Sequence, residues 1–233
     1  AAELEPGTNF SSGGQAAANL FFGDIEDAGE RAMRSTSLRS PPGKEKGGDA
    51  SAHLGPTPKQ LVEMLKRGEI NPNASVLDFG AGIRANAAEG LSRAGFTNVS
   101  ALDLPENMEI GRFFNALGDP EFVGARHFKS LNELTPQDVV MLQNVLNVQR
   151  KPEDLAELLD FAIGRVGDKG KILANFPGTP RRYITDKMTN EKVRGFFDDF
   201  PTDRESTDYL MDQFANRGFG KITRLRVPQS TAT

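Results

Sequence analysis

Two patterns of apolar and polar positions alternate along the chain from residue 57 onward. Short continuous apolar runs, such as SVLDF at 75–79 and DVVML at 138–142, are typical of buried strands. Between such runs, apolar residues recur every three or four positions, as they do over 152–166. That spacing places them on one face of an amphipathic helix.

These patterns predict a specific order of elements. Strands are expected at 75–79, 99–102, 125–128, 138–142, 171–176 and 221–227. Helices are expected at 59–67, 84–94, 106–117, 152–166 and 207–217, the first with Thr57 as its N-cap. Strands that alternate with helices of this length favour right-handed crossovers. We therefore predict a Rossmann-like α/β fold, with a mostly parallel sheet of six or seven strands and helices on both faces.

The segment 1–56 differs from the remainder of the chain. It is rich in Gly, Ser, Ala and Pro, with SSGG at 11–14 and PPGKEKGGD at 41–49. Such a segment buries too little apolar surface to offset the entropy of ordering it. We predict a largely disordered, flexible N-terminal extension followed by one domain over 57–233. An arm that docks through Leu20, Phe21 and Phe22 is the alternative. Within the domain, 177–206 is expected to be an irregular insertion and a candidate lid.

Composition narrows the classes of function. The chain of 233 residues has a formal net charge of −4, so no global basic field indicates nucleic acid or an anionic membrane. It contains no cysteine and only two histidines, which disfavours a metal site. No apolar run approaches the roughly 20 residues of a membrane span, and no secretory signal is visible. We expect a cytoplasmic protein that binds neither membrane nor metal.

The turn after the first strand carries the candidate chemistry. It is Asp78-Phe79-Gly80-Ala81-Gly82, in which two glycines allow the backbone to turn sharply and approach a ligand. An acid, Asp103, ends the second strand about 20 residues later, where a carboxylate can bind ribose hydroxyls. The same turn also fits the dinucleotide pattern G-x-G-x-x-A. Asp78 argues against that alternative, because a carboxylate repels a nearby pyrophosphate.

These motifs are similar to those of a known family. SVLDFGAG followed by ALDLPENM resembles the first two motifs of the class I S-adenosylmethionine (SAM)-dependent methyltransferases, and DVVMLQNVLNV and GDKGKILANFP resemble the later strands. The resemblance covers roughly 57–176. It differs at Arg84, where the family often has a third glycine, and in the single late strand.

The resemblance implies a cofactor site for SAM. Its residues would be Asp78 to Gly82 in the loop (Asp78, Phe79, Gly80, Ala81, Gly82), Asp103 at the ribose, Leu104 against the adenine, Ser130 near the adenine amine, and Thr57 near the SAM carboxylate. Asn144, which follows the fourth strand, would contact the cofactor and also serve as the candidate catalytic residue. Each residue also has a structural interpretation, as a cap, a turn or a core position.

The expected activity is transfer of a methyl group from SAM to an unidentified acceptor, by positioning and in-line displacement. The acceptor is open among small molecules, proteins and nucleic acids. The absence of N/D-P-P-Y/F at Gln143–Leu146 counts against a standard DNA amino-methyltransferase. Two alternatives stay open, namely a non-catalytic SAM-fold module of a larger protein and an NAD(P)-dependent enzyme.

Overall fold

The computed structural model describes residues 56–146, 149, 151–175, 184–185, 192–193 and 196–223. Its centre is a parallel sheet of four strands in the order β2-β1-β3-β4. The strands are β1 (Ser75–Phe79), β2 (Asn98–Leu102), β3 (Gln137–Leu142) and β4 (Val166–Ala174). Because β1 is flanked by β2 on one side and β3 on the other, the strand order reverses beside it. This is the doubly wound arrangement of a Rossmann-like fold.

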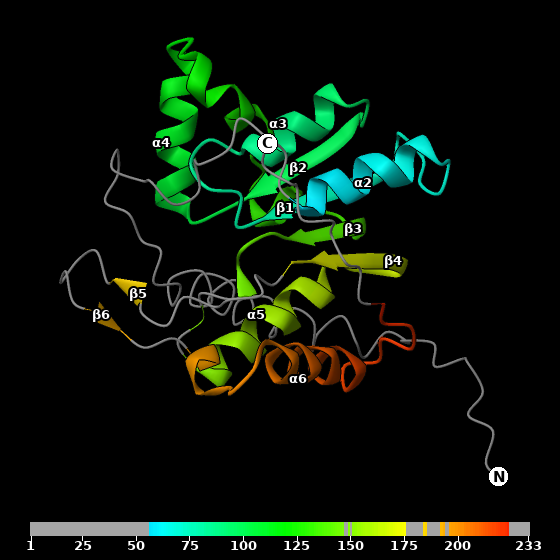
Figure 1. Cartoon of the computed structure of the whole chain (residues 1–233). Helices are drawn as coiled ribbons and strands as arrows, with labels where there is room; N and C mark the ends of the chain where they lie inside the picture. Colours follow the sequence, from blue (N-terminus) through cyan, green and yellow to red (C-terminus); the bar gives the residue numbers. More distant parts are fainter. Residues whose placement is uncertain are drawn as a thin grey trace, which may run out of the picture.

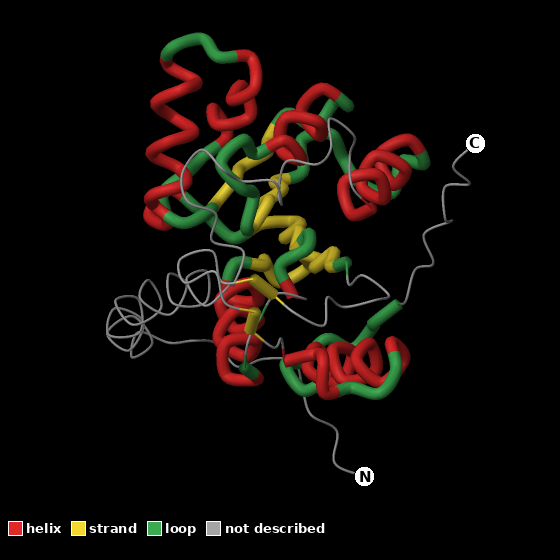
Figure 2. The backbone as a smooth tube through the Cα atoms, turned by 60° about the vertical axis from the view of Figure 1, so that its left-hand side comes forward, coloured by secondary structure: helices red, strands yellow, loops and turns green. Residues whose placement is uncertain are grey.

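Helices cover both faces of this sheet (Figures 1 and 2). They are α2 (Pro56–Lys66), α3 (Asn86–Arg93), α4 (Pro105–Ala116), α5 (Pro152–Gly164) and α6 (Asp203–Ala215). Neighbouring residues of β1 show the two faces. The Phe79 ring lies 5.2 Å from that of Phe161 in α5, while Asp78 accepts a backbone hydrogen bond from Ala88 in α3. Successive side chains of a strand point to opposite faces, so α3 and α5 lie on opposite sides.

Three short 3-10 helices and a small hairpin complete the described elements: η1 (Pro120–His127), η2 (Leu131–Glu133), η4 (Phe196–Asp199), and the antiparallel pair β5 (Ile184–Thr185) and β6 (Lys192–Val193). The hairpin and η4 lie within the expected insertion. The Phe196 ring of η4 packs with Tyr209 of α6. Helix α6 lies beside α5 (Figure 1), and an ion pair of 2.6 Å joins Arg217, after α6, to Asp160 of α5.

The expected number of strands is wrong for the described part of the chain, which has four in the main sheet rather than six or seven. The predicted strand at 125–128 lies mostly in η1, and only Phe128 forms a single parallel bridge, with Ala101. Gly124 packs against the backbone of Arg84 and Ala85, so a tight helical turn occupies that place. Of the predicted strand at 221–227, residues 221–223 are not a strand and the others lie outside the described residues.

Several boundaries also differ from prediction, among them the starts of α2 and β4. α2 begins at Pro56, so Thr57 lies inside its first turn and is not its N-cap. Prolines are tolerated in a first turn because those N–H groups lack helical partners anyway. β4 begins at Val166 and so includes Gly167 and Gly170, which precede the predicted strand at 171–176. Its register with β3 shifts between Gln137 and Val139. The strand is therefore irregular at its start.

No helix among the residues that the structure describes is long and apolar enough to cross a membrane. The expected extension 1–56 lies outside the described residues, apart from Pro56.

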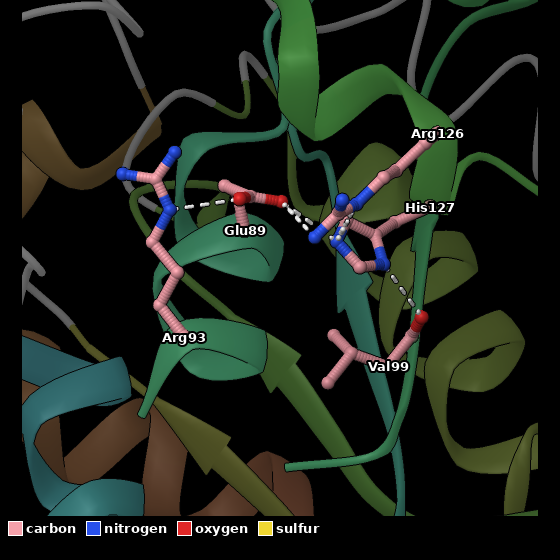
Figure 3. A network of polar contacts seen from close by, with 5 residues as sticks. All are labelled: Glu89, Arg93, Val99, Arg126 and His127. Atoms are coloured by element: carbon pink, nitrogen blue, oxygen red, sulfur yellow. Dashed lines mark hydrogen bonds and ion pairs between the residues drawn. The ribbon is translucent and has the colours of Figure 1, made fainter. Parts of the chain in front are cut away.

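A buried carboxylate joins α3, β2 and η1 (Figure 3). Glu89 is 8% exposed, and its oxygens lie 2.8 Å from Arg93, 2.9 Å from Arg126 and 3.1 Å from His127 Nε2. His127 Nδ1 in turn lies 3.2 Å from the Val99 carbonyl. Burial alone would raise the pKa of the Glu89 carboxyl, but hydrogen bonds from Arg93 and His127 and the charge of Arg126 hold it below its usual value.

We expect Glu89→Gln to lower the free energy of unfolding by about 1–3 kcal/mol at pH 7, because the cations lose their buried partner. A carboxyl with a lowered pKa stabilises the fold above its unfolded pKa, and this stabilisation is lost as the pH falls through the folded pKa. The difference between wild type and variant should therefore shrink toward pH 3. Urea unfolding of both proteins at pH 7 and at pH 3 measures this difference in the free energy of unfolding. Glu109→Gln, on the exposed side of α4, is the control, and an equal loss there would contradict the account.

Candidate functional site

The loop after β1 is held by backbone hydrogen bonds to the end of β2. The N–H groups of Gly80 and Ala81 both donate to the Leu102 carbonyl, at 2.9 and 3.2 Å. Gly80 and Gly82 have φ values of +75° and +70°, a region that favours glycine. The two glycines are thus required by the backbone path, and they bring the loop directly over the neighbouring strand.

Asp103 fixes the second half of this loop. Its Oδ2 accepts from the Gly82 N–H at 2.6 Å, and its Oδ1 accepts from the Leu104 N–H at 2.8 Å and from Asn107 Nδ2 at 2.6 Å. Asp103 is 8% exposed, and burial raises the pKa of its carboxyl despite these three hydrogen bonds. The carboxylate therefore joins the glycine loop to the start of α4.

Asp78 lies on the other side of the loop, within β1. It is 2% exposed, and its Oδ2 has no hydrogen-bond partner among the described residues. Burial, and then the charge of Asp103, raise the pKa of Asp78 to about 7. Neither acid has an ion pair within the described part of the chain. The structure thus brings together two buried acids beside one glycine loop, without a cation to offset them.

Two further buried oxygens lack hydrogen-bond partners among the described residues. They are Thr57 Oγ1, in the first turn of α2, and Gln143 Oε1, directly after β3. A third, Gln137 Oε1, lies at the opposite, amino end of β3 and does not belong with them. Buried polar atoms are normally hydrogen-bonded, so acceptors without donors indicate a missing donor. The unpaired oxygens of Asp78, Thr57 and Gln143 suit a ligand that brings N–H or O–H groups.

The loop is packed tightly from behind by two other glycines. A Cβ added to Gly111 of α4 would lie 2.3 Å from the Ile83 carbonyl, and one added to Gly124 of η1 would lie 2.2 Å from the Arg84 carbonyl. Ala85 ends the loop with a φ of +46°. The backbone of the loop is therefore fixed by contacts from α4 and η1 as well as by Asp103.

Arg84, the departure from the family pattern, has a place in this arrangement. It is not among the residues with positive φ, so its position needs no glycine. Its guanidinium forms an ion pair with Glu121 at 2.8 Å and lies 5.5 Å from the centre of the Phe122 ring. Arg84 thus binds η1 and leaves the loop's turn unchanged.

The other predicted site residues have different surroundings. The Phe79 side chain is fully buried on the α5 side, so only its backbone is available at the loop. Leu104 is buried at the start of α4. Ser130 is exposed, and both its N–H and its hydroxyl donate to Glu133 at 2.7 Å, so it caps η2. Asn144 follows β3 with a φ of +57° and bonds to Asn175.

Sequence reasoning missed Asn107, Gln143 and Asn175. Asn107 lies four residues after Asp103 in a helix, a spacing at which side chains meet, so that signal was present. Asn175 follows a strand directly, and polar residues at carboxyl ends of parallel strands are candidates by position. Gln143 directly follows β3 and was a candidate by the same rule, whereas the lack of a partner for its oxygen depends on burial. Among the described residues, no cluster of three or more His, Asp or Glu side chains could hold a metal ion.

No protein-family model matches this chain, and no curated protein matches its sequence. The solved structures that are similar to it include methyltransferases. A candidate O-methyltransferase from Nostoc punctiforme is 17% identical, with a TM-score of 0.48, over 89% of this chain and 64% of that one. A SAM-dependent methyltransferase from Clostridium acetobutylicum is 17% identical, with a TM-score of 0.38, over 54% and 51%.

A third, from Geobacter sulfurreducens and in complex with S-adenosylhomocysteine, is 15% identical, with a TM-score of 0.37, over 57% of each chain. The matched region thus spans little more than half of the Clostridium and Geobacter proteins. Likenesses this weak assign no family and no activity to this chain.

Proposed function

We propose that this chain binds SAM at the loop Asp78–Gly82 and transfers its methyl group to an acceptor. The observation that carries the proposal is the pair of buried acids, Asp78 and Asp103, on the two sides of the glycine loop without a cation. A ligand with a positive charge and N–H donors satisfies both acids. A dinucleotide brings a negatively charged pyrophosphate to this place, and close like charges are unfavourable.

The unpaired oxygens fit the aminoacyl end of SAM. An ammonium group offers three donors, and the acceptors proposed for them are Asp78 Oδ2, Thr57 Oγ1 and Gln143 Oε1. In the proposal, Asp78 ionises when the ammonium binds, because an opposite charge nearby favours the charged carboxylate. Thr57 and Gln143 complete the set from α2 and from the end of β3.

Asp103 holds the ribose in this proposal. A carboxylate has about four acceptor positions, and three are used by Gly82, Leu104 and Asn107. One position on Oδ2 is left for a ribose hydroxyl, and a second hydroxyl takes the place of the Asn107 side chain. Gly82 has open space where a Cβ would stand, so its backbone is accessible to the ligand. Leu104 supplies apolar contact for the adenine, as the family resemblance implies. The adenine amine donates to a backbone carbonyl or to the Ser130 oxygen, which donates to Glu133 but keeps its acceptor lone pairs.

When bound, SAM supplies a methyl group on a sulfonium, which a nucleophile of the acceptor takes by in-line displacement. The chain contributes orientation, because holding two reactants in a near-attack arrangement can supply much of the reduction in the activation barrier. The fixed loop and the residues after β3, Asn144 among them, are the parts that supply it. We place this activity in one domain over 57–233 that belongs in the cytoplasm, with 177–206 as a candidate lid.

Transfer of tritium from methyl-labelled SAM into pooled DNA, RNA, protein and metabolite fractions tests the activity. We expect label in one fraction, and loss of that label with Asp103→Asn. A thermal-shift comparison of SAM, S-adenosylhomocysteine and NAD(P) separates the dinucleotide alternative. If SAM binds and no fraction is labelled, the chain is a SAM-binding module and the proposed transfer is wrong.

A further inference from the structure

Two asparagines form a reciprocal pair at the carboxyl edge of the sheet. Asn144 lies two residues after β3, and Asn175 lies directly after β4, the neighbouring strand. The Asn144 N–H donates to Asn175 Oδ1 at 2.6 Å, and Asn175 Nδ2 donates to Asn144 Oδ1 at 2.8 Å. The Asn175 backbone is itself tied to β3, because its N–H donates to the Leu142 carbonyl at 3.1 Å. We call Asn144 and Asn175 the amide pair.

The orientation of both amides follows from one backbone group. A backbone N–H can only donate, so the atom of Asn175 that faces the Asn144 N–H must be its oxygen. The nitrogen of Asn175 then faces the side chain of Asn144. Because this nitrogen can only donate, the Asn144 atom that it meets must be the side-chain oxygen. The usual ambiguity between the oxygen and nitrogen of an asparagine is therefore removed. The φ of +57° at Asn144 is part of the same arrangement.

The amide pair consequently presents donors to its surroundings. Each side-chain oxygen already accepts one hydrogen bond from within the pair, which leaves one acceptor position on each amide. Two side-chain amides carry four N–H groups in all, and one of them is used inside the pair, which leaves three. Two of these belong to Asn144, which is exposed. Three N–H groups against two acceptor positions therefore favour a group that accepts hydrogen bonds.

We propose that the methyl acceptor carries a carbonyl-type oxygen, such as that of a carboxylate, which the Asn144 amide nitrogen holds. This inference rests on the proposed function, because it takes the edge beyond β3 and β4 as the place of the acceptor. It assigns Asn144 a positioning role through its N–H groups, whereas the family resemblance implies a catalytic residue and a cofactor contact. Asn175 is a second positioning residue, which fixes which atom of Asn144 faces outward.

The test uses a matched pair of small compounds, benzoate and benzylamine, which share a ring and differ in the group they present. The full chain, labelled with nitrogen-15, is first saturated with S-adenosylhomocysteine, and saturation is checked by calorimetry. Each compound is then titrated while the side-chain amide signals of Asn144 and Asn175 are followed by NMR. We expect benzoate to shift the Asn144 signal in a saturable manner and benzylamine to leave it in place.

Asn175→Asp is the informative variant. It keeps an acceptor for the Asn144 N–H, removes the donor to Asn144 Oδ1 and adds a negative charge, so benzoate binding should weaken about tenfold or more. Asn98→Asp makes the same change at the exposed start of β2, at the opposite edge of the sheet, and should leave benzoate binding unchanged.

A larger response to benzylamine than to benzoate, or none to either, overturns the inference while leaving SAM binding intact. Equal weakening by both variants also overturns it, since the effect would then reflect only net charge. Failure of S-adenosylhomocysteine to bind at all overturns the proposed function, and the inference with it.

Discussion

Alanine at position 124 is expected to lower the free energy of unfolding by about 2–3 kcal/mol and to weaken SAM binding. The added Cβ would lie 2.2 Å from the Arg84 carbonyl and 2.5 Å from the Ala85 carbonyl. Both atoms are backbone, so neither can rotate away as a side chain can. Overpacking of this kind typically costs about 1–3 kcal/mol, because the backbone itself must shift. Here the part that shifts is the end of the glycine loop.

The control is Gly164→Ala at the end of α5, where a Cβ would meet nothing within 4 Å. That substitution should be neutral or stabilise by about 0.4–1 kcal/mol, since alanine reduces the entropy of the unfolded chain. Urea unfolding gives the two free energies, and calorimetry at a temperature where both variants are folded gives the affinity. A Gly124→Ala protein that is as stable as wild type and binds SAM equally well would show that η1 does not support the loop.

Asp78→Asn is expected to raise the free energy of unfolding at pH 8 by about 2–4 kcal/mol and to have almost no effect at pH 4. The pKa of Asp78 is about 7 in the fold, against an ordinary value of 3.8. An unfolded chain releases this proton near pH 4, whereas the folded chain keeps it until about pH 7. Between these values the unfolded state binds fewer protons, so stability falls as the pH rises. Each pH unit of that interval corresponds to 1.36 kcal/mol, and roughly 4 kcal/mol is the upper limit.

The difference between wild type and variant isolates Asp78 from the other acids, which titrate in both proteins. Unfolding curves at pH 4, 6 and 8 provide the measurement, and a difference that does not change with pH would contradict the burial of this carboxyl. The same proton governs the ligand. Because the proposed ammonium binds the ionised carboxylate, SAM affinity should rise nearly tenfold from pH 5.5 to 6.5 in wild type. In Asp78→Asn the affinity should be lower and independent of pH over this range.

The central strands could be predicted from sequence because burial on both faces leaves a short, continuous apolar run. β1 was predicted with its observed bounds, and β3 within one residue at its start. The same rule failed at 125–128, where an apolar run lies in a 3-10 helix that packs on the loop. The composition of this run does not distinguish a strand from a 3-10 helix. The outcome depends on the contact of Gly124 with Arg84, and these residues are 40 positions apart in the sequence.

The residues of the candidate site also divide into those that the sequence could predict and those that it could not. Asp78, Asp103 and the two glycines could be chosen from sequence because their spacing reflects one β-turn-α-β unit. The acceptor oxygens of Thr57 and Gln143 are notable only because the fold buries them, and burial is a property of the whole structure. Asn144 and Asn175 meet because β3 and β4 are neighbours in the sheet, and that arrangement was itself a prediction. The placement of Ser130 near the cofactor rests on the family resemblance and stays a prediction, and the structure adds that Ser130 donates to Glu133, three residues on.

Calorimetric titration of SAM into wild type and into Asp103→Asn, at pH 7.5, tests the central claim most directly. The claim is that the two buried acids beside the glycine loop form a site for a cationic nucleoside. It predicts one-site binding by wild type, and affinity at least about tenfold weaker in the variant, since a carboxylate hydrogen bond to a hydroxyl is lost. S-adenosylhomocysteine, which keeps the ammonium and ribose, should show the same ratio. No binding of either compound by wild type, or equal binding by both proteins, would contradict it.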